Sequence, residues 1–120
     1  MAKVFESDEE RLRQWAYMNS IGLPEELCEL ESMIIPIVIN YIPETIFLLS
    51  RLVVLDCKGS NIESLPDRIG HLSKLELLNC SRNKLESLPD SIGNLSNLEH
   101  LDCSRNKLES LPDSIGNLSK

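Results

Sequence analysis

Residues 98–120 read LEHLDCSRNKLESLPDSIGNLSK, and residues 75–97 read LELLNCSRNKLESLPDSIGNLSN. These two stretches agree at 20 of 23 positions, and residues 52–74 agree with residues 75–97 at 12 positions. A unit of this length cannot bury its own apolar face, so consecutive copies must stack into a solenoid. The repeat therefore decides the architecture of the chain.

Each unit places apolar residues at the same positions. In the third unit these are Leu98, Leu101, Cys103, Leu108, Leu111, Ile115 and Leu118. The alternation around Leu101 predicts a short strand with one buried face. Pro112 cannot donate to a strand ladder, so the strand must end before it. Each unit is therefore expected to hold a strand, a turn and a short irregular or 3-10 return.

The pattern resembles the leucine-rich repeat family, in the subtype that carries Leu-Pro-x-x-Ile-Gly-x-Leu. This resemblance implies an α/β solenoid in which short parallel strands line a concave face and irregular or 3-10 segments return the chain. It also implies that Asn83 and Asn106 form a buried ladder, with their amides paired to backbone groups of the neighbouring unit. The first unit departs from the pattern, because it has Ser60 followed by Asn61.

Residues 1–22 do not fit the repeat and predict an N-terminal capping helix for the solenoid. Ser7 and Glu10 have the spacing of a capping box, and Gly22 suits a C-terminal stop. Leu12, Trp15 and Ala16 fall on one helical face. Trp15 is expected in the core, with a place on the binding surface as the alternative.

Residues 23–51 match the unit loosely and are interpreted as degenerate leucine-rich repeats, one shortened repeat plus the tail of another. The segment Met33–Tyr41 is too short for a full unit, and its apolar run Met33–Ile39 predicts a buried strand. That run is far below the roughly 20 residues that a membrane helix needs. Residues 52–120 are expected to form three regular leucine-rich repeats of equal length. A truncated chain, self-association or a covering partner would each explain why no fourth copy follows Lys120.

Composition narrows the range of functions. The chain has 120 residues and a net charge of −7, which predicts one domain and disfavours binding to nucleic acid phosphates. Its first residues lack the apolar run of a secretory signal peptide, so a cytoplasmic location is expected. No membrane or small-molecule partner is indicated.

The cysteines predict packing rather than chemistry. Cys57, Cys80 and Cys103 recur at one framework position and should stack inward, where they act as small apolar residues beside the asparagine ladder. Neighbouring strands point their Cβ atoms in parallel, which is poor geometry for a disulfide. No Cys-x-x-Cys pair exists to bind a metal, so no metal or other cofactor is expected.

The residues typical of catalysis do not converge in this pattern. His71 falls on a return segment and His100 on a strand, so the two histidines should lie on different faces. Cys103 should face the core while His100 faces solvent, which argues against a Cys-His nucleophile pair. No catalytic residue is assigned, and the chain is not expected to be an enzyme.

The outward-facing strand residues predict a protein-binding face. Stacking should align them in columns: Val54, Leu77 and His100; Asp56, Asn79 and Asp102; Lys58, Ser81 and Ser104; and, after Gly59, Arg82 and Arg105. The alternative is an ordinary solvated face on which Asp102 and Arg105 compensate each other. Binding is favoured, because a concave solenoid sheet is a ready recognition surface and arginine often anchors interfaces.

The sequence therefore predicts a non-catalytic interaction module that binds a partner protein and inhibits it by covering a functional surface. The chain also resembles, more weakly, the leucine-rich-repeat effectors that intracellular bacterial pathogens deliver into host cells. That resemblance implies the host cytosol as location and a host protein or a co-delivered effector as partner. The alternative is a recognition fragment of a larger protein whose catalytic or signalling part lies beyond residue 120.

Overall fold

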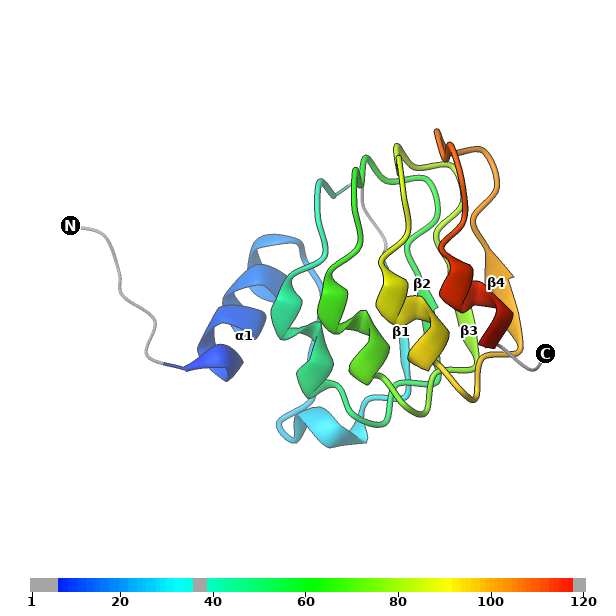
Figure 1. The fold of residues 1–120 in the computed structure, drawn as a ribbon. Coiled ribbons are helices and arrows are strands. Elements are labelled where there is room, and N and C mark those ends of the chain that lie inside the picture. The colour runs from blue at the N-terminus through cyan, green and yellow to red at the C-terminus, as the bar shows by residue number, and fades with distance from the viewer. Residues whose placement is uncertain (1–6, 36–38, 118–120) are drawn as a thin grey trace.

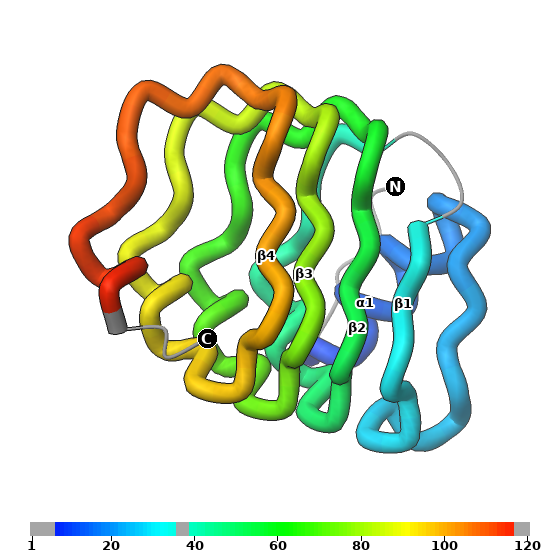
Figure 2. The backbone as a smooth tube through the Cα atoms, turned by 90° about the vertical axis from the view of Figure 1, so that its right-hand side faces the viewer, coloured from blue at the N-terminus to red at the C-terminus, as the bar shows by residue number. Residues whose placement is uncertain are grey.

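The computed structural model describes residues 7–35 and 39–117, and these form a stack of similar turns with one helix at its start (Figures 1 and 2). Four short strands form one parallel sheet in the order β1-β2-β3-β4. The strands are β1 (Ser32–Ile34), β2 (Val54–Asp56), β3 (Leu77–Asn79) and β4 (His100–Asp102). The expected solenoid of short parallel strands is confirmed.

Short 3-10 helices return the chain on the opposite side of the stack from the strands (Figure 1). This row consists of η2 (Glu44–Leu48), η3 (Asp67–His71), η4 (Asp90–Asn94) and η5 (Asp113–Asn117), whereas η1 (Leu27–Glu29) comes just before β1. In the four helices of this row, a proline immediately precedes the helix, where its fixed φ suits the start and its missing N–H is not needed. The prediction of a short return after each strand is confirmed.

Strand register follows the repeat. Val54 pairs with Leu77 and Leu77 with His100, which are steps of one full repeat. Ser32 pairs with Val54, and this step is one residue shorter. The Ile35 N–H donates to the Asp56 carbonyl, as the Cys57 N–H does to that of Asn79. Residues 30–51 therefore make a complete unit, shortened by one residue between 35 and 39.

This unit corresponds to the shortened repeat of the sequence interpretation, and Met33–Tyr41 is only a part of it. Part of the strand expected over Met33–Ile39 lies outside the described residues, at 36–38.

The core is a set of apolar columns that run along the stack. Residues at equivalent positions in successive units, such as Leu55 and Leu78 or Ile46, Ile69 and Ile92, are fully buried. Each contributes about 1.5–3 kcal/mol by leaving water. Stability thus comes from contact between units rather than from any single unit.

Glycine allows the 3-10 helices to stack closely. A Cβ atom at Gly70 would lie 2.6 Å from the Ser91 carbonyl oxygen, and one at Gly93 would lie 2.5 Å from that of Ser114. The Ser91 and Ser114 hydroxyls each donate to a carbonyl of the preceding unit at 2.5 Å. The Ile-Gly part of the repeat is therefore a requirement of stacking.

Helix α1 (Asp8–Met18) packs against η2 at the N-terminal end of the stack. Ser7 is its N-cap and accepts from the Glu10 N–H at 3.1 Å, as the capping-box spacing predicts. The predicted apolar face is buried: Leu12, Trp15 and Ala16 are at most 5% exposed. Trp15 lies in the core, and its Nε1–H donates to the Tyr41 carbonyl at 3.2 Å. No helix among the described residues is long and apolar enough to cross a membrane.

Candidate protein-binding face

The strand residues that point away from the core form a four-stranded floor, which we call the concave floor: Ser32, Ile34, Val54, Asp56, Leu77, Asn79, His100 and Asp102. Pairing places Ser32, Val54, Leu77 and His100 in one column, and Ile34, Asp56, Asn79 and Asp102 in the next. The structure thus forms both predicted columns, and successive members of each column lie on adjacent strands.

Sequence reasoning missed the contribution of β1 to this floor. Ser32 and Ile34 extend both columns by one strand, and Ile34 is 65% exposed. Together with the half-buried Val54 and Leu77, it makes an apolar patch at the N-terminal end of the floor. The signal was present in the sequence, because Met33 precedes Leu55 by one residue less than the repeat length and matches it in type.

The polar column has a structural task that was not predicted. One carboxylate oxygen of Asp102 accepts from the Ser104 N–H at 3.0 Å and from the Ser104 hydroxyl at 2.6 Å. Asn79 holds Ser81 in the same way, and Asp56 accepts from the Lys58 N–H at 3.1 Å. These side chains form Asx turns at the ends of β2, β3 and β4.

The hydrogen bonds also explain the charge state of Asp102. The Ser104 hydroxyl and N–H, followed by the cations of Lys58 and Arg82, lower the pKa of this carboxyl. Lys58 and Arg82 therefore lie close enough to Asp102 to act on it across the units.

Residues just past the strands divide into exposed and buried ones. Lys58 and Ser104 are exposed, as expected for a binding face. Ser81 is only 3% exposed, so its assignment to the binding face was wrong. Its hydroxyl turns back to Asn79 at 2.7 Å, and the covering third unit removes the rest of the residue from solvent.

Arg82 and Arg105 occupy the turn that follows each strand and are exposed. Their φ angles are +56° and +55°, and Gly59 has +78° at the same position of the first unit. Neither guanidinium makes a hydrogen bond or ion pair within the part of the chain that the structure describes. We call these arginines and the exposed Lys58, Lys84 and Lys107 the basic rim.

The asparagine ladder is confirmed. Asn83 donates through Nδ2 to the carbonyls of Cys57, Cys80 and Ser81, and its Oδ1 accepts from the Ile62 N–H at 3.1 Å. Asn106 repeats these contacts one unit later, including the Leu85 N–H at 3.0 Å. Each amide thus fixes the turn of its own unit and ties it to the preceding one.

The framework cysteines are free and pack inward, as predicted. Cys57 and Cys80 are fully buried and Cys103 is half-buried. Burial raises the pKa of Cys57 to about 12, and it raises the pKa values of Cys80 and Cys103 as well. Among the described residues, no group of three Cys, His, Asp or Glu side chains could hold a metal ion.

The histidines lie on opposite sides of the stack. His100 is exposed on β4, whereas His71 ends η3, where its ring meets the edge of Phe47 at a centroid distance of 6.1 Å. The Arg68 guanidinium stacks over the same Phe47 ring at 4.7 Å. His71 therefore belongs to a packing cluster on the return side.

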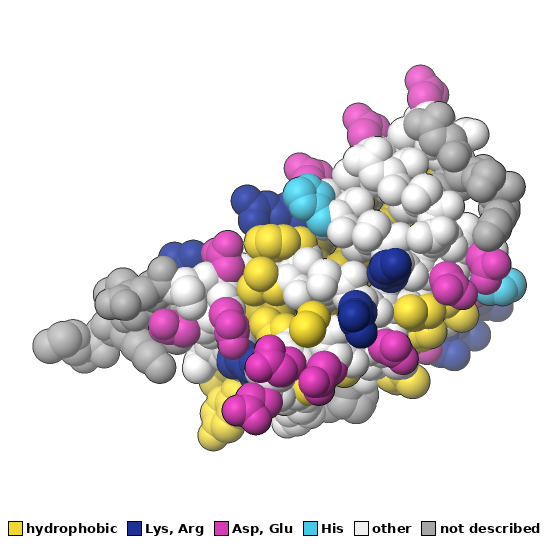
Figure 3. All heavy atoms as spheres, turned by 90° about the horizontal axis from the view of Figure 1, so that it is seen from below, with side chains coloured by type: hydrophobic (Ala, Val, Ile, Leu, Met, Phe, Trp, Pro, Cys, Tyr) yellow, Lys and Arg dark blue, Asp and Glu magenta, His cyan; other side chains and the backbone are white. Residues whose placement is uncertain are grey.

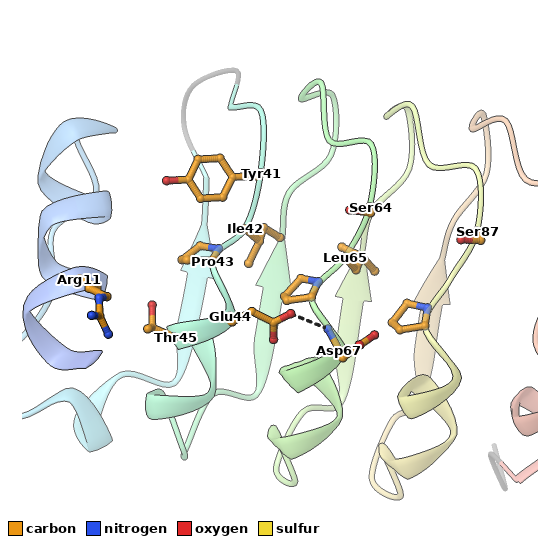
Figure 4. Close-up of a pocket in the computed structure, with 12 residues that line it drawn as sticks. Arg11, Tyr41, Ile42, Pro43, Glu44, Thr45, Ser64, Leu65, Asp67 and Ser87 are labelled. Carbon is orange, nitrogen blue, oxygen red and sulfur yellow. Dashed lines mark hydrogen bonds between the residues drawn. The ribbon is translucent and has the colours of Figure 1, made fainter. Parts of the chain in front are cut away.

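A hollow, which sequence reasoning did not find, lies between α1 and the loops that lead into the 3-10 helices (Figure 4). It has a volume of about 830 Å³, and its rings come from Tyr41, Pro43, Pro66 and Pro89. The Thr45 hydroxyl at its edge is buried and has no hydrogen-bond partner among the described residues. Glu44 is engaged there, because its carboxylate accepts from the Asp67 and Arg68 N–H groups.

The edge of the stack at which the strands begin lies opposite the basic rim and carries mixed charge. Viewed from below, acidic and basic side chains lie interspersed there (Figure 3). A small hollow at this edge is lined by Glu31, Arg51, Val53 and Lys74. Its two cations therefore share the hollow with a carboxylate.

Comparisons with known proteins agree with this architecture. The sequence model of the leucine-rich repeat region matches residues 27–120. Among solved structures, a leucine-rich repeat protein of Leptospira interrogans is similar, with 39% identity and a TM-score of 0.65. That match covers 67% of this chain and 20% of that protein, so the chain spans one fifth of its length.

A complex of BIR3 and SERK2 from Arabidopsis thaliana also matches, over 90% of this chain and 85% of that one. Its 18% identity and TM-score of 0.48 are too low to carry an argument. No curated protein matches the chain.

Proposed function

The chain belongs to the leucine-rich repeat family, and from this premise we propose that it is a non-catalytic module that binds a partner protein through its concave floor. The observation that carries the proposal is that near-identical frameworks present different chemistry on this floor. Units two and three differ at three positions, and two of these, Leu77/His100 and Asn79/Asp102, lie on it. A floor that served only the fold would have no need of that difference.

The size of the floor agrees with a modest interface. Four strands at about 4.8 Å spacing make a narrow strip. A stable interface takes roughly 800 Å² from each partner, so the neighbouring basic rim must contribute as well. A partner that covers Ile34, Val54 and Leu77 would remove these apolar side chains from water, and such a buried centre carries most binding energy.

We propose further that binding inhibits the partner by covering a functional surface, and that the chain works in the cytoplasm. If it is a delivered effector, that location is the host cytosol and the partner a host protein or another effector. The second candidate is a recognition module within a longer protein, which is supported by the short share of the Leptospira protein that the chain spans.

A capture experiment with paired variants tests the proposed face. The variant Leu77→Arg/His100→Glu alters the concave floor, and Asn94→Arg/His71→Glu makes the same kind of change on the return side. A partner retained by the wild type and the return-side variant, but lost by the floor variant, is the expected result. Loss with the return-side variant alone, at native circular dichroism for both, would overturn the proposal. The captured partner's activity should then fall on addition of the chain.

A further inference from the structure

The two arginines of the basic rim occupy a backbone conformation that disfavours them. Arg82 and Arg105 have φ near +55°, a region in which residues other than glycine, asparagine and aspartate are uncommon. The equivalent residue of the first unit is Gly59, which takes this conformation without steric cost. The fold therefore accepts glycine here, and arginine occupies the position against its backbone preference.

Neither guanidinium is held by a direct contact among the described residues, although the charge of Arg82 acts on the Asp102 carboxyl of the next unit. Both side chains are exposed, and neither forms a hydrogen bond or an ion pair among residues 7–35 and 39–117. The Asx turns beside them are made by Asn79 and Asp102 through Ser81 and Ser104, without the arginine side chains. The arginine side chains therefore take no part in the hydrogen bonds that hold these turns.

Charge gathers at the rim. Lys58, Arg82, Lys84, Arg105 and Lys107 supply five of the 12 Lys and Arg residues of a chain whose net charge is −7. Asp56 and Asp102 are the carboxylates of the concave floor beside these cations, and Glu63, Glu86 and Glu109 follow further along each loop. The five cations of the rim therefore outnumber the two carboxylates of the floor.

We propose that the concave face takes an acidic protein segment, with its carboxylates on Arg82 and Arg105 and an apolar side chain on Ile34, Val54 and Leu77. This inference rests on the proposed function. Guanidinium forks bind carboxylates through two parallel hydrogen bonds, and the arginines lie on adjacent units, so two carboxylates can be held side by side. A nucleic acid fits less well, because it would meet a chain with excess negative charge and an apolar floor.

The test uses yeast-displayed random peptides as the probe and the full chain as the bait. Arg82→Gly/Arg105→Gly removes both guanidiniums and suits the positive φ, so its melting temperature should not fall. Arg51→Ser/Lys74→Ser removes the same charge from the opposite end of the strands and serves as the matched control. Arg82→Lys/Arg105→Lys keeps the charge and loses the fork, and Leu77→Glu disables the floor.

The expected result is selection of peptides rich in Asp and Glu with apolar residues between them. Their affinity should fall about tenfold or more with the glycine variant and by less than about threefold with the Arg51/Lys74 control, with the lysine variant between the two. If the glycine variant has a lowered melting temperature, the lysine variant is compared with the wild type instead. The lysine variant must then bind the acidic peptides more weakly than the wild type does.

Three results would overturn the inference. Peptides that lack acidic residues but require Leu77 would refute the acidic partner and leave the proposed concave-face function standing. Acidic peptides that bind the glycine and lysine variants as well as the wild type would refute the role of the arginines. No enrichment, or peptides indifferent to both Arg82/Arg105 and Leu77, would refute the inference and the proposed face together.

Discussion

The second and third units are nearly the same sequence in two different surroundings. Leu88 is 5% exposed, and Leu111, its equivalent, is 50% exposed. Leu78, Cys80, Leu85 and Ile92 are fully buried, whereas Leu101, Cys103, Leu108 and Ile115 are partly exposed. The second unit is covered on both sides, and no described residue follows the third in the stack.

The difference shows that burial in this fold belongs to the junction between units and not to the unit. The same Leu-x-Cys strand becomes core or half-exposed surface according to its neighbour. Stability should therefore be divided among nearest-neighbour junctions, as in a one-dimensional array. Identical substitutions in the two units then measure what a covering neighbour contributes.

Leucine truncation should give the largest contrast. Leu78→Ala removes a fully buried side chain that packs between two units and should cost about 2–5 kcal/mol in the free energy of unfolding. Leu101→Ala affects a partly exposed residue and should cost roughly half as much. Urea unfolding of both variants under the same conditions measures the two values. Equal costs would show that the third unit is as well covered as the second.

Adding a methyl group to equivalent 3-10 helices should give the next largest contrast between the second and third units. A Cβ at Gly93 would lie 2.5 Å from the Ser114 carbonyl oxygen, while nothing lies within 4 Å of one at Gly116. Gly93→Ala should therefore cost about 1–3 kcal/mol, and Gly116→Ala should be close to neutral. Thermal melts followed by circular dichroism provide the measurement. A destabilised Gly116→Ala variant would contradict the view that the neighbour creates the constraint.

The sequence carried the framework of this fold because the framework repeats. The strands, the returns, the asparagine ladder and the inward cysteines all follow from positions that recur once in every unit. The strand of the shortened unit over residues 30–51 was not placed on the floor, because one missing residue shifts Ser32 and Ile34 out of the 23-residue spacing that Ile39 and Ile42 keep. A search for the pattern that also allowed a unit one residue shorter would have placed Ser32 and Ile34 on the concave floor.

The candidate site could be predicted only in part. The columns follow from the alternation of apolar residues along the strand. The Asx turns of Asn79 and Asp102 depend instead on the backbone after the strand, which brings the Ser81 and Ser104 hydroxyls within hydrogen-bond distance of them. The burial of Ser81 depends on the next unit in the same way. The positive φ of Arg82 had one sequence signal, the glycine at the matching position 59.

The asparagine ladder should show a smaller contrast than the leucines. Both amides make the same four contacts, but Asn83 is 7% exposed and Asn106 is half-buried. Asn83→Ala leaves buried carbonyls and an N–H without partners and should cost about 1–3 kcal/mol, with Asn106→Ala at the low end of that range. Unfolding by urea gives both values. An unchanged stability of Asn106→Ala would show that water replaces the amide at the third unit.

The thiols report the same contrast with no change in stability. The thiolate is the reactive form, and burial raises the pKa of Cys57 to about 12 and also raises that of Cys80, so both should resist a maleimide at pH 8. Cys103 is half-buried with a raised pKa and should react more slowly than the exposed Cys28 but faster than the other two. Mass spectrometry of peptides after timed labelling gives the four rates, and denaturant should make them similar. Labelling of Cys80 as fast as Cys103 in the native chain would mean that the junction between units two and three opens readily. The third unit would then protect the Cys80 thiol less than its burial indicates.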